Sequence, residues 1–248
     1  MKKPLLALIA ALLAGALLAC ERTIPDYSVA EAFDLMNDAI DGWLDAKSFT
    51  LSYEGTYTVG DNVSEETMSV KLKNGGSDNL IAFVVTSITE TDRWQQSETQ
   101  FEDGRSYAAR NENGSISRTW KAETGASFET LYRTFLKRTI DLSDIRNESI
   151  LVDPDQCTFL FEYDANEIEE TFYVPPQITN VTFATVSVTF SHRGELLSID
   201  VSYGTFEGEL RGTESYQVTF AKLDRYVVIS QMSATEKAYY TEATDDEE

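Results

Sequence analysis

The chain has 248 residues, of which 42 are acidic and 20 are basic, so its formal net charge is −22. This excess of carboxylates repels DNA, RNA and anionic lipid surfaces, and no basic stripe offsets it, which excludes nucleic-acid binding. With 42% hydrophobic and 11% aromatic residues, the chain can bury one sizeable core and is expected to fold as a single domain.

The N-terminus has the pattern of a secretory leader. Lys2 and Lys3 precede an apolar stretch from Leu5 to Ala19, which is too short for a helix that crosses a bilayer. The run Leu17-Leu18-Ala19-Cys20 resembles the bacterial lipobox. That resemblance implies that the Cys20 thiol receives a diacylglyceryl group through a thioether and that the leader is cleaved before Cys20. The two palmitate-type chains of this group would anchor the protein to a membrane.

These features divide the chain into four parts. We expect a signal peptide at 1–19, a lipidated linker at 20–26, one domain at 27–232 and a flexible acidic tail at 233–248, which lacks an apolar period. The alternative for the leader is ordinary cleavage after Ala14-Gly15-Ala16. That cleavage would leave a soluble secreted protein without an anchor.

The domain begins with a pattern typical of an amphipathic helix. Ser28 and Glu31 are spaced as in a capping box, in which each side chain satisfies a free backbone N–H group of the other residue. Apolar residues then recur every three or four positions, which predicts one core-facing side. These residues are Val29, Phe33, Met36, Ile40 and Trp43.

From residue 49 the apolar period changes to two, which indicates antiparallel strands joined by tight turns. Asp103-Gly104 and Asn113-Gly114 are two-residue hairpin turns, since both positions of such turns need positive φ. After residue 184 the alternation returns, and it predicts strands through Phe220 and a further one at Val227 and Ile229. The sequence therefore predicts a series of hairpins, not a parallel sheet.

A second helix is expected near residue 126. Its apolar side would carry five residues, Phe128, Leu131, Tyr132, Phe135 and Leu136. Arg133, Lys137 and Arg138 would gather at its C-terminal end, where basic side chains complement the helix dipole.

No residue pattern points to catalysis or to a bound metal. His192 is the single histidine and lies in a predicted hairpin turn, which disfavours a nucleophile–base pair. One histidine and one remaining cysteine cannot fill a zinc shell, and no calcium loop is present. With 42 acidic residues, close carboxylate pairs are inevitable and say little about glycosidase chemistry. We therefore expect no cofactor, no metal site and no enzyme activity.

Cys157 has no disulfide partner once Cys20 carries the lipid. It lies within a strand-like run, where a buried apolar thiol is the simplest interpretation.

The order of predicted elements over residues 27–232, on a lipidated chain, resembles the lipoprotein-carrier superfamily of the bacterial envelope. That superfamily includes periplasmic lipoprotein chaperones and mycobacterial lipid-carrying lipoproteins. The resemblance implies an α+β fold in which a strongly curved antiparallel sheet forms a half-barrel and helices cover its open concave side. The space between sheet and helices would hold a lipid-like ligand. Its candidate lining residues are Phe33, Ile40, Trp43, Leu131 and Phe135.

The leading hypothesis is a membrane-anchored binding protein of the bacterial envelope that holds or shuttles a hydrophobic ligand. The first alternative is an envelope interaction module with a filled core, whose acidic surface docks a basic protein partner. A carboxylate-based enzyme is the third.

Overall fold

The computed structural model describes residues 24–59, 62–91, 93–174, 181–207 and 210–243. The predicted signal peptide and Cys20 lie outside these residues, so the structure tests neither. Within the described chain, no helix is both long and apolar enough to cross a membrane.

Twelve strands form one sheet in the described chain, accompanied by four helices and a short 3₁₀ turn. The helices and the 3₁₀ turn are α2 (Val29–Asp45), α3 (Gly125–Tyr132), η1 (Leu142–Asp144), α4 (Ile168–Thr171) and α5 (Ala234–Lys237). The first six strands are β1 (Phe49–Val59), β2 (Asn62–Lys73), β3 (Ile81–Glu90), β4 (Arg93–Glu102), β5 (Arg105–Glu112) and β6 (Ser115–Ala122). The others are β7 (Ile145–Val152), β8 (Gln156–Tyr163), β9 (Val181–Ser191), β10 (Leu196–Glu207), β11 (Leu210–Ala221) and β12 (Thr241–Glu242).

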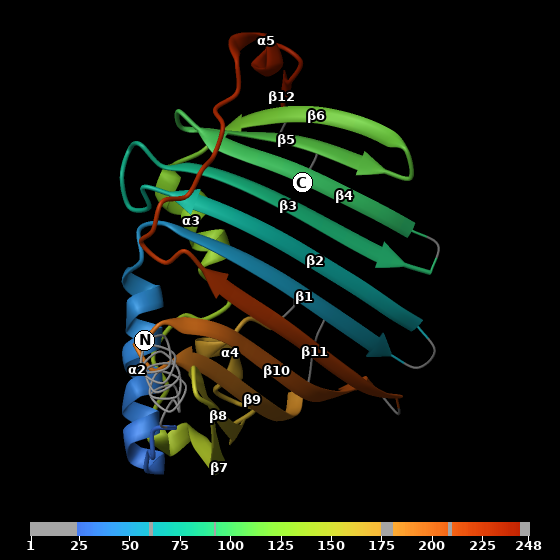
Figure 1. The fold of residues 1–248 in the computed structure, drawn as a ribbon. Helices are drawn as coiled ribbons and strands as arrows, with labels where there is room; N and C mark the ends of the chain where they lie inside the picture. The colour runs from blue at the N-terminus through green and yellow to red at the C-terminus, as the bar shows by residue number, and fades with distance from the viewer. Residues whose placement is uncertain (1–23, 60–61, 92, 175–180, 208–209, 244–248) are drawn as a thin grey trace, which may run out of the picture.

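The strand order is β12-β6-β5-β4-β3-β2-β1-β11-β10-β9-β8-β7, so two runs of hairpins meet where β1 pairs with β11. All neighbours are antiparallel except β12, which pairs in parallel with β6. The sheet is curved and does not close, as Figure 1 shows. The predicted hairpin turns are confirmed, since Asp103, Gly104, Asn113 and Gly114 all have positive φ. The expected strand at Val227 and Ile229 is wrong, because this segment has no ladder partner.

One face of the sheet, here called the interior face, carries the core. Alternate residues of β1, β8, β9, β10 and β11 are buried, as the period of two predicts. Helix α2 lies on this face and contacts β7, β8, β9 and β10. In Figure 1, α3 and α4 lie behind the sheet, whereas the C-terminal segment crosses in front of it. Helices therefore cover the interior face, and the C-terminal segment crosses the opposite face.

Helix α2 begins as predicted. Ser28 accepts a hydrogen bond from the backbone N–H of Glu31 at 3.2 Å, and the Glu31 carboxylate accepts one from the Ser28 N–H at 2.9 Å. Its apolar side is buried, including Met36, Ile40 and Trp43. Its other side exposes five acidic residues, Glu31, Asp34, Asp38, Asp41 and Asp45.

The second helix is shorter than predicted. It ends at Tyr132, so Phe135 and Leu136 lie in the segment that follows it. That segment is held by α2, because the Trp43 indole donates to the Leu136 carbonyl at 3.3 Å and Asn37 makes two hydrogen bonds to the Ile140 backbone. These bonds use backbone groups that a longer helix would need for itself.

The C-terminal segment differs from the expected flexible tail. Residues 233–243 contain α5 and β12, and Ser233 and Glu236 form a second capping box. The Lys237 ammonium lies 2.6 Å from the buried Glu102 carboxylate, and Tyr240 packs edge-on against Tyr107. Residues 244–248 lie outside the described chain. Anchoring contacts, not an apolar period, therefore place this segment on the sheet.

Candidate functional site

The five candidate lining residues have different environments. Ile40 and Trp43 are fully buried, and Phe135 is 2% exposed. Phe33 is partly buried and packs on Phe159 with ring centroids 5.8 Å apart. The prediction that Leu131 lines this space is wrong. Leu131 is 56% exposed, because it lies on the side of α3 that faces solvent. Four of the five therefore contact the core between α2 and the sheet, and Leu131 does not.

Trp43 is held firmly in that core. Its ring meets those of Phe49 and Phe220 edge-on, with centroids 4.7 and 4.6 Å apart. Arg133 lies over its face at 5.4 Å. These contacts fix the orientation of the Trp43 ring in the core.

A second group of interior side chains, missed by sequence reasoning, is polar. Five tyrosines and two glutamates lie together on β1, β2, β10, β11 and the segment after α4. We call this group the interior tyrosine cluster: Tyr53, Tyr57, Glu66, Tyr173, Tyr203, Glu214 and Tyr216. The strand register creates it, because Glu214 of β11 pairs with both Tyr57 of β1 and Tyr203 of β10.

Gly55 makes room for the cluster. It lies between Tyr53 and Tyr57 on the interior face of β1, and the two tyrosine hydroxyls meet over it in a hydrogen bond. A Cβ atom at this position would lie 2.8 Å from the Tyr57 hydroxyl. Tyr57 donates onward to the Glu66 carboxylate at 3.2 Å. Glu66 is partly exposed, so the hydrogen bonds lead from a partly exposed carboxylate to the buried Tyr53 hydroxyl.

Three residues of the cluster, Tyr203, Glu214 and Tyr216, have a buried polar atom without a hydrogen bond within the described chain. The Tyr203 side chain is 1% exposed and the Glu214 side chain 4% exposed, yet neither the Tyr203 hydroxyl nor the Glu214 Oε2 atom forms a hydrogen bond there. A buried polar atom without a partner costs about 1–3 kcal/mol. In folded proteins such atoms are usually satisfied by an ordered water, an ion or a bound molecule.

The cluster has an unusual charge state because it is removed from water. Burial raises the pKa of the Glu214 carboxyl to about 7, and it also raises the pKa of Glu66. Burial raises the pKa of the Tyr173 phenol to about 12, so this phenol stays neutral. Neither Glu66 nor Glu214 forms an ion pair with any described residue. The cluster can therefore donate and accept hydrogen bonds but contributes no positive charge.

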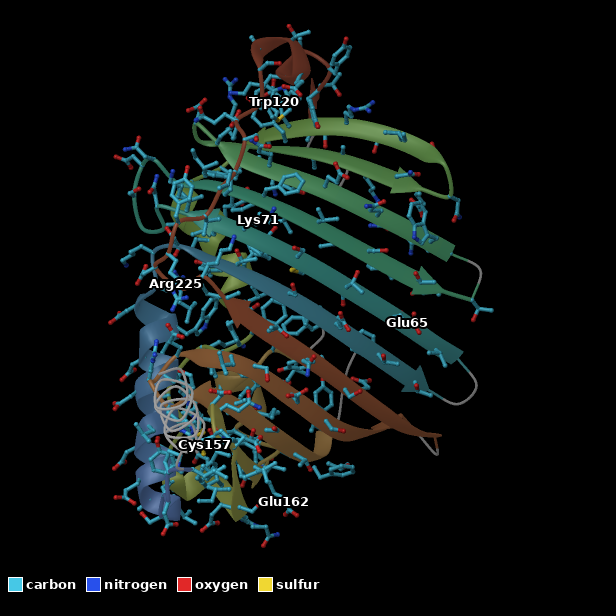
Figure 2. The ribbon with its side chains drawn as sticks, in the orientation of Figure 1. Glu65, Lys71, Trp120, Cys157, Glu162 and Arg225 are labelled. Carbon is cyan, nitrogen blue, oxygen red and sulfur yellow. The ribbon has the colours of Figure 1, made fainter. Side chains whose placement is uncertain are left out.

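The opposite face of the sheet has its own pocket, of about 440 Å³, beneath the C-terminal segment. Phe83, Gln100 and Tyr107 form its floor, and Met232, Tyr239 and Tyr240 come from the segment itself. Arg105 stacks on Trp120, which lies near the place where this segment meets β6 (Figure 2). This pocket depends on a segment that was expected to be free.

His192 and Cys157 both have environments that the structure describes. The His192 ring nitrogens lie 3.2 Å from the Tyr27 hydroxyl and 2.7 Å from the Asp153 carbonyl oxygen, so this side chain joins two segments. Cys157 is a buried free thiol, and burial raises its pKa, which disfavours the reactive thiolate. Among the described residues, no group of His, Cys, Asp or Glu side chains could hold a metal ion.

The signal for the tyrosine cluster was present in the sequence. Glu66 and Glu214 share the strand phase of Met68, Tyr216 and Val218, which places carboxylates on the side that should be apolar. Strand alternation therefore gives the direction of each side chain. It does not show that residues from four strands meet.

No family model matches the chain. No curated protein matches its sequence at a significant level. Among solved structures, the chain is similar to LprF from Mycobacterium bovis, with a TM-score of 0.46 and 12% identity over 84% of this chain and 99% of that chain. It is also similar to MucB in complex with MucA(peri), with a TM-score of 0.14 and 8% identity over 81% of this chain and 99% of that one. Both TM-scores are below 0.5, so neither similarity carries an argument about fold family, ligand or activity.

Proposed function

We propose that the protein is a lipid-anchored, extracytoplasmic binding protein that holds or shuttles a lipid-like ligand. In this proposal the curved sheet acts as a half-barrel, and the helices close its concave side. The ligand would lie between Phe33, Ile40, Trp43 and Phe135 and the interior face of the sheet. The role is one of binding, without catalysis.

The observation that carries the proposal is a set of buried polar atoms in the interior tyrosine cluster that form no hydrogen bond within the described chain, among them those of Tyr203 and Glu214. Both lie beside an apolar face that would suit an acyl chain, and both are hydrogen-bonding groups that would suit a polar end. Ligand sites combine these two features: mostly apolar walls and a few polar groups that fix orientation.

The first experiment is native mass spectrometry of residues 21–248, which retain every described element, followed by organic extraction. We expect a bound mass that extracts as lipid. A clean mass of the chain alone, unchanged after incubation with lipids, would contradict the proposal and favour the alternative below.

The anchor is tested separately. Labelling with radioactive palmitate in a bacterial host should tag the full chain, and Cys20→Ala should lose both the label and the membrane-bound fraction. If the Cys20→Ala chain were still labelled at its N-terminus, the lipidation proposal would be wrong.

The alternative is an envelope interaction module that docks a basic protein partner on its acidic surface. The observation in its favour is the exposed acidic side of α2, with five carboxylates on one helix. Co-purification with one partner that is lost as salt rises from about 0.05 to 0.5 M would support this function, because salt screens exposed charges.

A further inference from the structure

The interior tyrosine cluster contains two carboxylates and five phenol rings but no ion-pair partner from the described chain. Glu214 Oε2 is an acceptor without a hydrogen bond, and its residue is 4% exposed. The Tyr216 ring lies within 5.6–6.4 Å of the rings of Tyr53, Tyr173 and Tyr203. None of the described residues brings a positive charge to the cluster.

An anionic polar group would be a poor occupant. It would lie next to Glu214 and Glu66 in a region shielded from water, where like charges repel strongly. No arginine, lysine or histidine pairs with either carboxylate within the described chain. Free fatty acids and phosphate monoesters are therefore disfavoured.

A cation would interact favourably with both the tyrosine rings and the buried carboxylate. Ring faces of tyrosine attract ammonium groups through the negative potential of their π-systems, and the attraction grows when water is excluded. A carboxylate beside such rings supplies the compensating charge. A quaternary ammonium needs no hydrogen-bond acceptor of fixed geometry, so several rings and one carboxylate are a suitable set of partners.

We propose that the interior tyrosine cluster binds the ammonium group of an amphiphile, with Glu214 as its counter-ion and Tyr203 among the surrounding rings. This inference rests on the proposed function and specifies its ligand class. The acyl part of the same molecule would lie along the apolar face toward α2. Glu66, which is partly exposed and hydrogen-bonded to Tyr57, would attract the cation on entry.

The test compares three amphiphiles of equal chain length: dodecyltrimethylammonium, dodecyl maltoside and dodecanoate. Each is titrated, below its micelle-forming concentration, into residues 21–248 carrying a fluorescent fatty-amine probe, and displacement is measured. We expect the ammonium compound to bind at least about tenfold tighter than the maltoside, and the dodecanoate weakest, because one desolvated charge contact is worth roughly that factor. Raising the pH from about 6 to about 8 should strengthen ammonium binding, since Glu214 loses its proton in this range.

Variants distinguish binding at the interior tyrosine cluster from binding at the exposed acidic surface. Glu214→Gln should weaken ammonium binding about tenfold and leave maltoside binding unchanged. Glu54→Gln, on the exposed side of β1, is the matched control and should change neither. If Glu214→Gln does not fold, Glu66→Gln and Tyr203→Phe take its place, and each should reduce the preference for the ammonium compound.

Two results would overturn the inference. Equal or tighter binding of dodecanoate would show that the cluster does not select a cation, as would a Glu214→Gln chain that keeps the ammonium preference. Either result leaves the proposed function intact, because an amphiphile still binds. If none of the three compounds binds and no lipid is extracted, the proposed function fails together with the inference.

Discussion

Arg133 caps the C-terminal end of α2 by binding its last carbonyl groups. Helix α2 has no basic residue of its own in its last turn. Its guanidinium donates to the carbonyls of Trp43 and Leu44 at 3.1 and 3.4 Å, and also to that of Ala46. Glu129 holds the same guanidinium at 2.7 Å and accepts from the Gly76 N–H at 2.7 Å. The Arg133–Glu129 ion pair therefore joins α2, α3 and the β2–β3 turn.

We predict that Arg133→Met lowers the free energy of unfolding by about 3 kcal/mol, because it leaves Glu129 and several helix carbonyls without partners. Urea denaturation followed by circular dichroism measures this change. The control is Arg110→Met, whose ion pair with Glu112 is exposed and should contribute less than about 0.5 kcal/mol. Equal effects of both variants would contradict the capping role.

Gly55 gives a second prediction at the residue scale. Gly55→Ala should lower stability by about 1–3 kcal/mol, because the new methyl group would separate the Tyr53 and Tyr57 hydroxyls. Gly42→Ala is the comparison, since no atom lies within 4 Å of a Cβ there. That variant should raise stability by about 0.5–1 kcal/mol through helix propensity. Thermal melts of the two variants should move in opposite directions, and a stabilising Gly55→Ala would contradict the packing.

At the scale of elements, the C-terminal segment crosses the face of the sheet opposite to the interior face. We call residues 232–243 of this segment the strap. Glu102 of β4 is completely buried, and three groups contact its carboxylate. The Lys237 ammonium forms an ion pair with Oε1, which makes no hydrogen bond, whereas Oε2 accepts from the Gln100 amide at 3.0 Å and from the Met232 N–H at 3.3 Å. Two of the three belong to the strap. The sheet and the strap therefore stabilise each other.

Lys237→Met should lower the free energy of unfolding by about 2 kcal/mol, because the Glu102 charge loses its main partner. Hydrogen exchange should show faster exchange of the β4 and β5 amides. Arg225→Met is the control, since its ion pair with Glu195 is exposed and is expected to contribute little. An unchanged exchange pattern in Lys237→Met would mean that the strap is not coupled to the sheet.

At the scale of the whole molecule, stability should depend on pH through Glu214. Its pKa is about 7 in the folded chain and near the ordinary value of 4.5 in the unfolded chain, so the folded state binds the proton more tightly. The stabilisation from this group is full below about pH 4.5 and is lost as the pH rises through about 7. The net charge of −22 adds repulsion in the same direction.

The measurement is urea denaturation of wild type and Glu214→Gln between about pH 5 and pH 8. Wild type should lose stability over this range, and the variant should lose less, because glutamine does not titrate. Parallel curves for the two chains would show that Glu214 is not held in its neutral form.

Local signals in the sequence determined most of the secondary structure. The capping box at Ser28 and Glu31 set the start of α2, and the Asp-Gly and Asn-Gly pairs set the hairpin turns, because these motifs depend on residues within four positions. Strand alternation gave the interior face of each strand, including the buried position of Cys157. The acidic composition was likewise a property of the sequence alone.

Only the tertiary structure decided the remaining features. The end of α3 depends on bonds from Trp43 and Asn37 to a segment some hundred positions away, with separations of 93 and 103 residues. The strap depends on Lys237 reaching Glu102, and the tyrosine cluster on β1 pairing with β11. The free energy of these contacts comes from groups that meet only after the sheet has formed, so no local pattern of residues encodes them.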